Sequence, residues 1–296
     1  MREAARGMNQ ATAGMIIDCA GKALDLSNPQ VMGVLNITPD SFYSLSRCQT
    51  PQQALERAWQ MVEEGAAIID VGAEATNPQL TPTNSAATEL DRIVSVVELL
   101  ARELPVPISV DTSKADVIRA VAAAGAGLIN DVRALREPGA LQAAVAAQLP
   151  ICLMHMQFPN GVAANAEPFD YPDGVVNVVK NFLQERINIC LDAGIAAHQL
   201  MIDPGIGGGN FGKSCDQNVT ILRHLVEFKN LGYPLLIGVS RKLFLGELLE
   251  AAPEQRLAGS LAATTIAVAA GANIIRTHDV KATRDTVRVT SAILSN

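Results

Sequence analysis

From Val31 to the end of the chain, short apolar runs alternate eight times with longer stretches of helical periodicity. In the longer stretches apolar residues recur every three or four positions, as at Leu90, Ile93 and Val97, which is typical of a helix with one buried face. The short runs lack polar alternation, so they are interpreted as parallel strands buried on both faces. These runs cover residues 31–35, 67–69, 107–110, 127–129, 151–154, 200–202, 235–239 and 272–275.

This alternation predicts an α/β protein, and its count and length favour a (β/α)₈ TIM barrel. Eight strands and about eight helices occupy some 265 residues, and such barrels take about 250 residues. A doubly wound open sheet shares the alternation and is the alternative. No Pro-, Gly- or Ser-rich linker divides the chain, so we expect one domain over residues 15–296, behind a loose tail of residues 1–14. Residues 15–26 are expected to form an N-terminal β-hairpin around Gly21 that covers the bottom of the barrel.

Charge and cysteine usage narrow the class of protein. The net charge of −7 gives no indication of a basic face for nucleic acid, and no uncharged apolar run reaches the ~18 residues of a membrane span. The five cysteines are scattered, without a C-x-x-C pair, which is typical of reduced thiols in the cytoplasm. We therefore expect a cytoplasmic protein with neither nucleic acid nor a membrane as its partner.

Polar residues follow each apolar run. In a barrel the carboxyl ends of all strands meet at one mouth, where barrel active sites lie. Any one of these residues could simply cap the next helix. Eight sets at one mouth instead indicate a polar site, because buried charges are costly unless they are paired or used. The sets are Asn36, Asp70 with residues 74–76, Asp111, Asn130 with Asp131, His155, Asp203, residues 240–242 and residues 276–278.

The signs of these groups divide the mouth into two sides. Basic groups follow the seventh and eighth strands, and the guanidinium fork suits phosphate; the alternative is that Arg241 and Lys242 are a solvated pair at the start of a helix. Carboxylates and an amide follow strands three to six and suit a donor-rich heterocycle. The sequence therefore predicts a small phosphorylated or pyrophosphorylated heterocycle as the ligand. The basic groups are Arg241, Lys242, Arg276 and His278, and the acceptors are Asp111, Asn130 and Asp203.

A glycine-rich segment, residues 207–214, matches both the phosphate-loop pattern G-x-x-x-x-G-K-[ST] and the dinucleotide pattern G-x-G-x-x-G. Both patterns require a strand directly before and a helix directly after the segment. Here residues 203–205 intervene after the strand, and helical periodicity resumes only near Val219, behind the better cap residues Asp216 and Asn218. We therefore expect a flexible rim loop over the mouth, and neither an NTPase nor a Rossmann dehydrogenase.

Metal ligands are sparse in this sequence. The four histidines are far apart, without an H-x-x-x-H pair, and residues 154–156 are expected to form pocket wall. A Mg²⁺ ion held by Asn36 and by phosphates of the substrate would need few protein ligands. The sequence context supports no Ser–His–Asp or Cys–His nucleophile arrangement.

Eight short motifs occur between about Ile16 and Ser295, at residues 32–42, 68–76, 108–112, 129–131, 154–157, 203–205, 238–242 and 276–280. Each motif alone is modest, but their order and spacing together are highly specific. With these motifs the chain resembles dihydropteroate synthase, a pterin-binding TIM-barrel family.

The resemblance implies an alkyl-group transferase of folate biosynthesis that is a sulfonamide target and a homodimer. In this reaction the amine of p-aminobenzoate displaces pyrophosphate from 6-hydroxymethyl-7,8-dihydropterin pyrophosphate and gives 7,8-dihydropteroate, with Mg²⁺ on the leaving group. Fixed positive charge stabilises the growing negative charge. The two alternatives are a non-catalytic pterin-binding paralogue and a barrel like methyltetrahydrofolate methyltransferase, which has less need for Arg276 and His278.

The resemblance also implies roles for single residues. The catalytic groups would be Asp111, Lys242, Arg276 and His278. The pterin would be held by Asp111, Asn130, Asp203 and Lys242. Pyrophosphate and Mg²⁺ would be held by Asn36, Arg276 and His278, with Thr76 nearby. The p-aminobenzoate site would include Phe211, Ser240 and Arg241.

Three segments depart from the family pattern, and all three are expected in rim loops. Residues 43–47 replace the usual Ser-Asp-Gly-Gly, and the loop at residues 206–213 is longer than usual. Asn77 stands where the family has arginine, and Arg47 could supply part of the missing charge. The motifs that would form the pterin floor are intact.

Overall fold

The computed structural model describes residues 15–37, 50–72, 86–157, 169–207 and 211–295. Eight strands form one parallel sheet, in the order β8-β7-β6-β5-β4-β3-β10-β9. The two edge strands also meet, because Ile202 pairs with Leu235 and the Ile202 N–H donates to the Pro234 carbonyl at 2.9 Å. The sheet therefore closes on itself, and the predicted (β/α)₈ TIM barrel is confirmed. The strands are β3 Gln30–Asn36, β4 Ile68–Gly72, β5 Ile108–Asp111, β6 Leu128–Asp131, β7 Ile151–Met154, β8 Leu200–Asp203, β9 Leu236–Gly238 and β10 Ile274–Thr277.

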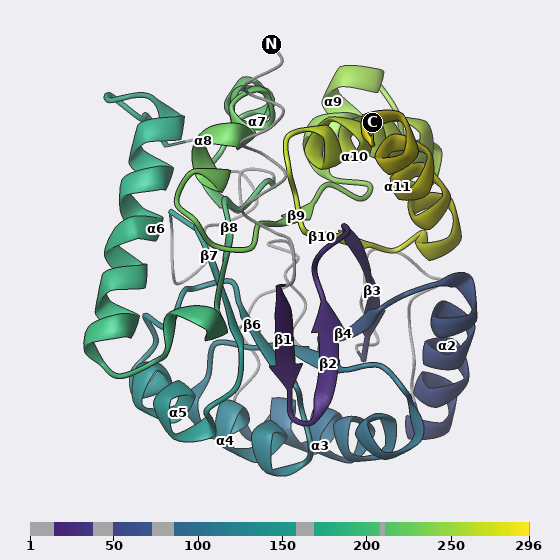
Figure 1. Cartoon of the computed structure of the whole chain (residues 1–296), viewed down its shortest axis with the longest axis vertical. Coiled ribbons are helices and arrows are strands. Elements are labelled where there is room, and N and C mark those ends of the chain that lie inside the picture. Colours follow the sequence, from purple (N-terminus) through teal and green to yellow (C-terminus); the bar gives the residue numbers. More distant parts are fainter. Residues whose placement is uncertain (1–14, 38–49, 73–85, 158–168, 208–210, 296) are drawn as a thin grey trace.

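Helices surround the strands (Figure 1). Their ends follow local chemistry: α2, for example, begins at Pro51 behind Thr50, whose hydroxyl accepts from the Gln53 N–H at 3.2 Å, and stops at Gly65 with φ +102°. Within the described residues, no helix is long and apolar enough to cross a lipid bilayer. The helices are α2 Pro51–Glu64, α3 Ala86–Glu103, α4 Ala115–Ala123, α5 Ala140–Ala147, α6 Val175–Asp192, α7 Cys215–Arg223, α8 Leu225–Lys229, α9 Leu243–Leu249, α10 Leu257–Ala269 and α11 Val280–Leu294.

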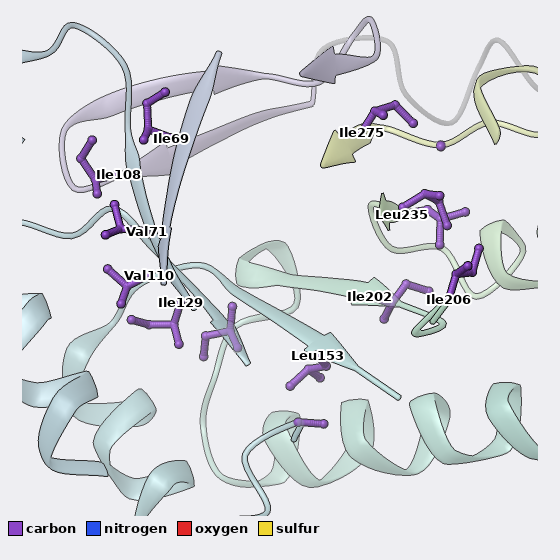
Figure 2. Close-up of a cluster of buried hydrophobic side chains, with 14 of the residues drawn as sticks. Ile69, Val71, Ile108, Val110, Ile129, Leu153, Ile202, Ile206, Leu235 and Ile275 are labelled. Carbon is purple, nitrogen blue, oxygen red and sulfur yellow. The ribbon is translucent and has the colours of Figure 1, made fainter. Parts of the chain in front are cut away.

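Strand side chains alternate between the barrel interior and the helix layer. Outward-facing apolar side chains such as Ile69, Val110 and Ile129 belong to the large core between the strands and the helices (Figure 2). The inward-facing side chains near the amino ends form a separate apolar cluster. This inner cluster contains Met32, Ile68, Leu128, Cys152, Met201, Leu236 and Ile274.

The N-terminal hairpin closes the bottom of the barrel, as predicted. Strands β1 Ile16–Cys19 and β2 Lys22–Asp25 pair antiparallel through a turn at Ala20 and Gly21, both with positive φ. The hairpin lies across the centre of the barrel in Figure 1, and Ile17 and Leu24 are buried in the inner cluster. The predicted tail, residues 1–14, lies outside the described residues.

Candidate active site

Towards the carboxyl ends of the strands, the inward-facing positions change from apolar to polar. The strand register places Asp70 beside Ser109, and Asp111 beside Asn130. Asp203 ends β8, and Arg276 is the third residue of β10. These six polar positions belong to five different strands of one closed sheet and face one mouth, and all but Ser109 were predicted there from the sequence.

Arg276 is the centre of this polar layer. Its Nε donates to Asp70 Oδ2 at 2.6 Å, and its Nη2 donates to Asp111 Oδ2 at 3.0 Å. Asp70 is fully buried and also accepts from Ser109 Oγ at 2.5 Å and from Asn130 Nδ2 at 3.3 Å. Burial opposes the charged form, but Asp70 and Asp111 together raise the pKa of Arg276 above its ordinary value. The guanidinium therefore stays charged and is held in one orientation.

Two further basic groups stand beside Arg276. Lys242 caps the start of α9, and its Nζ lies 4.7 Å from the centre of the Phe211 ring. Burial, and then Arg276, lower the pKa of Lys242 to about 8, although Asp203 and Asp111 oppose this. The structure thus brings Lys242 and Arg276, two of the predicted basic groups, together with the predicted carboxylates Asp111 and Asp203.

His278 is half-buried, and its backbone N–H donates to Ser240 Oγ at 3.2 Å. Burial, followed by the charge of Arg276, lowers the pKa of His278 to about 3. The imidazole is therefore neutral at pH 7, and an anion bound beside it would raise this pKa.

Asp203 is oriented by the turn that follows it. Its Oδ1 accepts from the Gly205 N–H at 2.7 Å. Gly205 has φ +72°, and a Cβ there would lie 1.9 Å from the His155 carbonyl oxygen, so only glycine fits this turn. Burial raises the pKa of Asp203, while the Gly205 N–H, Lys242 and Lys213 lower it.

Above this polar layer, four buried apolar side chains form a small cluster of their own: Val132, Met154, Met156 and Phe211. Phe211 packs directly over Gly207, where a Cβ would lie 1.6 Å from the ring. An apolar wall beside the carboxylates suits the flat face of a heterocycle. The two methionines were expected to be pocket wall, and they belong to this cluster.

The lysine of the glycine-rich segment is buried. The Lys213 side chain points into the protein, and its Nζ lies 2.9 Å from His155 Nδ1. Helix α7 begins at Cys215, earlier than predicted, because Ser214 and Gln217 form a capping box. The expectation that Asp216 or Asn218 caps this helix was therefore wrong.

Arg241 has φ +55° and turns its guanidinium to protein partners. Nε and Nη2 form a bidentate pair with Asp279 at 2.8 Å each, and Nη1 donates to the carbonyls of Pro253 and Glu254. These contacts tie the end of β9 to the segments before α10 and α11. The contact of Arg241 with p-aminobenzoate stays a prediction.

Asn36 ends β3, and its Oδ1 lies 3.7 Å from the position of a Cβ on Gly72, on the neighbouring strand. Among the described residues, no group of three or more His, Cys, Asp or Glu side chains could hold a metal ion. That Asn36 holds Mg²⁺ together with phosphate oxygens of a substrate therefore stays a prediction. Thr76, Asn77 and Arg47 lie outside the described residues.

Four residues that contribute to the structure of the site were assigned no role in it from the sequence. Asp70 was placed at the mouth because it follows the second strand, but its contact with Arg276 was not predicted. Nothing in the sequence around Ser109 indicates a role in the site, apart from its position on the inward-facing side of its strand. Lys213 and His155 were noted in motifs, but their contact joins two distant loops and is not visible in the sequence.

The chain matches the family model of the pterin binding enzyme over residues 32–278. It is 47% identical to the dihydropteroate synthase of Escherichia coli (strain K12) over 275 residues, which is 93% of this chain and 95% of the relative. A Xanthomonas albilineans dihydropteroate synthase with 4-aminobenzoic acid is similar in structure, with TM-score 0.86 and 44% identity over 96% of this chain and 99% of that chain. A Coxiella burnetii dihydropteroate synthase in complex with pteroic acid is also similar, with TM-score 0.86 and 41% identity over 95% of this chain and 98% of that chain.

Proposed function

Since the chain belongs to the pterin-binding enzymes and, among them, to the dihydropteroate synthases, we propose that the amine of p-aminobenzoate displaces pyrophosphate from 6-hydroxymethyl-7,8-dihydropterin pyrophosphate and gives 7,8-dihydropteroate. The observation that carries this proposal is Arg276, a charged guanidinium fixed by Asp70 and Asp111 at the mouth of the barrel. Positive charge there suits a leaving pyrophosphate, and the neighbouring carboxylates suit a pterin. The first step is loss of an anion, so no covalent nucleophile is needed.

The pterin is proposed to lie between the carboxylates and the apolar wall. Asp203 would present carboxylate oxygens as acceptors for the N–H donors of the pterin edge. Burial raises the pKa of Asp203, and the Gly205 N–H, Lys242 and Lys213 oppose that rise. Asn130 and Asp111 supply the remaining polar contacts from β6 and β5. Met154 and Met156 would contact the ring face.

The leaving pyrophosphate is proposed to lie against Arg276 and His278, because these groups provide charge and N–H donors at the carboxyl end of β10. Lys242 is proposed to contact the pterin. Asn36 would hold Mg²⁺ together with pyrophosphate oxygens. When bound, Mg²⁺ supplies a Lewis acid that neutralises charge on the leaving group. Chelation of Mg²⁺ is expected to slow turnover without loss of bare pterin binding.

p-Aminobenzoate is proposed to stack on Phe211, whose ring faces the Lys242 ammonium. Ser240 Oγ, which already accepts from the His278 N–H, can donate to the carboxylate of p-aminobenzoate. The amine would then point towards the pterin carbon that loses pyrophosphate.

Incubation of the protein with dihydropterin pyrophosphate, Mg²⁺ and labelled p-aminobenzoate tests this function. Labelled dihydropteroate and pyrophosphate are expected in equal amounts. Pterin binding without pyrophosphate release at millimolar Mg²⁺ would instead identify a non-catalytic paralogue. Methyl transfer from methyltetrahydrofolate would identify a methyltransferase.

A homodimer is proposed to form through the outer faces of α9, α10 and α11, which lie side by side in Figure 1. This surface exposes large apolar side chains, of which Ile293 is 77% exposed and Val289 is 60% exposed. Exposed apolar patches of this kind mark interaction sites. Val289→Glu is expected to shift the mass measured by light scattering from dimer to monomer.

A cytoplasmic location is also proposed, in accord with free thiols at the four described cysteines.

A further inference from the structure

Lys213 is one of the largest fully buried side chains in the described part of the protein, with 1% of its surface exposed. Its Nζ lies 2.9 Å from His155 Nδ1 and 3.4 Å from the His155 carbonyl oxygen. A buried ammonium group is costly unless other groups compensate it. The proposed reaction assigns no role to this lysine, although it follows Asp203 in the loop after β8.

The compensating carboxylate is Asp203. Lys213 Nζ lies 3.3 Å from the position of a Cβ on Gly205, and the Gly205 N–H donates to Asp203 Oδ1. The His155 N–H donates to the Asp203 carbonyl at 2.9 Å. Lys213 and His155 thus both lie directly beside the 203–205 turn.

His155 can serve as the acceptor for this ammonium group. Its ring packs edge-on against Phe182, with centroids 4.9 Å apart and an interplanar angle of 88°. Burial, followed by the charge of Lys213, lowers the pKa of His155 well below its usual range, so the ring is neutral. A neutral imidazole with its proton on Nε2 accepts at Nδ1.

We propose that Lys213 is a positioning residue for pterin binding: held on His155, its ammonium group keeps the Asp203 carboxylate ionised and aimed into the mouth. This inference rests on the proposed function. Burial lowers the pKa of Lys213 to about 7, and Asp203 acts against that shift. The charge of Lys213 in turn lowers the pKa of Asp203 against its burial.

Loss of the Lys213 ammonium group is therefore expected to change the pKa of Asp203 in one direction. Without Lys213, the buried Asp203 faces one cation fewer, so its pKa rises. Asp203 then takes up a proton as the pH falls, and the protonated carboxyl has lost an acceptor for the pterin edge. The other charged or titratable groups around this pair are Lys242, Arg276, Arg136, Cys152 and Tyr171.

The test compares Lys213→Met with the wild type in calorimetric titration with 6-hydroxymethylpterin, between about pH 6 and pH 9. The ratio of the two Kd values cancels titration of the pterin itself. We expect the variant to bind about tenfold more weakly at the acid end, since one pKa unit is a factor of ten, and to approach the wild type at the alkaline end. A ratio that is the same at every pH overturns the inference. Absence of pterin binding by the wild type would overturn the proposed function instead.

Lys229→Met is the matched control. Lys229 is a half-buried lysine at the opposite end of the barrel strands from the mouth: its Nζ donates to Asn273 Oδ1 at 2.9 Å, and Asn273 precedes the amino end of β10. The Kd ratio of this variant is expected to stay near one at every pH.

If Lys213→Met does not fold, His155→Phe is the second variant, because it keeps an aromatic ring against Phe182 and removes the acceptor for Lys213. This variant is expected to lose pterin affinity at the acid end as well, by a smaller factor than Lys213→Met. A ratio of its Kd to that of the wild type that does not change with pH would contradict the proposal.

Discussion

Arg276 occupies a position where an arginine needs strong compensation. Its guanidinium lies inside the barrel, and removing one partner of a buried ion pair typically costs about 3–5 kcal/mol, because the other charge remains buried. Asp70 would be that remaining charge, since Arg276 Nε is 2.6 Å from its carboxylate. Substitution of Arg276 or Asp70 is therefore expected to affect the stability of the barrel as well as the site at its mouth.

We expect Arg276→Met to lower both the free energy of unfolding and the turnover, and to weaken pyrophosphate binding more than bare pterin binding. Adding Asp70→Asn should restore part of the stability, because it removes the uncompensated charge, but should not restore turnover. Urea unfolding of both single variants and the double variant measures this coupling. Strictly additive changes in stability would contradict the pairing.

Asp203→Asn tests the acceptor role of this side chain. An amide replaces one acceptor with a donor, so pterin affinity should fall by about 1–3 kcal/mol, measured by calorimetry. Asp131→Asn is the control, because Asp131 also ends a strand but accepts from the backbone N–H groups of Arg133 and Leu135. That variant should unfold at a lower temperature and bind pterin as the wild type does.

The strand ends show what a sequence can and cannot reveal about such a barrel. The eight apolar runs identified every strand, because each run is buried on both faces. They placed β10 at residues 272–275, whereas the strand is Ile274–Thr277. Arg276 looked like a residue beyond the strand because an isolated arginine is unfavourable there; its partners Asp70 and Asp111 come from strands distant in sequence.

The segment between β8 and α7 was harder to predict for the same reason. Its structure depends on contacts between elements: Asn218 on α7 accepts from the Gly207 N–H at 2.9 Å, and Lys213 meets His155 on the loop after β7. The sequence correctly predicted residues between the end of β8 and the glycine-rich segment. The expected gap between that segment and the next helix was wrong, because α7 begins directly behind Ser214. The sequence did not show that the lysine points inward, because no local pattern encodes a contact between residues 58 positions apart.

Gly205→Ala is expected to distort this segment. A methyl group at φ +72° would lie 1.9 Å from the His155 carbonyl oxygen, so the turn must move and Asp203 must move with it. Gly232→Ala is the control, because Gly232 has φ +85° with no atom within 4 Å of its Cβ position. The control should lose only about 1 kcal/mol for the left-handed backbone, whereas Gly205→Ala should lose more and should also weaken pterin binding. Equal losses in thermal unfolding would contradict the steric argument.

The two ends of the barrel differ in composition: polar residues gather at the mouth, and apolar residues fill the bottom. The mouth gathers Asp70, Asp111, Asp203 and Arg276, whose burial is unfavourable without partners. The bottom is apolar and closed by the hairpin, which packs so closely that a Cβ on Gly127 would lie 2.7 Å from the Cys19 carbonyl oxygen. In TIM barrels the mouth serves catalysis and the bottom serves stability.

Lys22 provides a test of that division, because it attaches the hairpin to the outer helix layer. Its Nζ donates to the carbonyls of Ala101 and Leu104 at 2.8 and 2.7 Å, and to that of Val106 at 3.2 Å. These carbonyls belong to the end of α3 and the segment after it, where a cation is favourable. Lys22→Met keeps the aliphatic stem and removes all three hydrogen bonds.

We expect Lys22→Met to lower the free energy of unfolding by about 1–3 kcal/mol, since hydrogen bonds to a charged group contribute about 1.5–3 kcal/mol each and water replaces part of that loss. Pterin affinity and turnover, measured well below the unfolding temperature, should equal those of the wild type. Ile16→Lys is the control, because Ile16 is in the same hairpin but is 65% exposed, and it should change neither stability nor activity appreciably. A loss of pterin affinity in Lys22→Met would mean that the hairpin acts on the mouth through the strands, and that the two ends of the barrel are not independent.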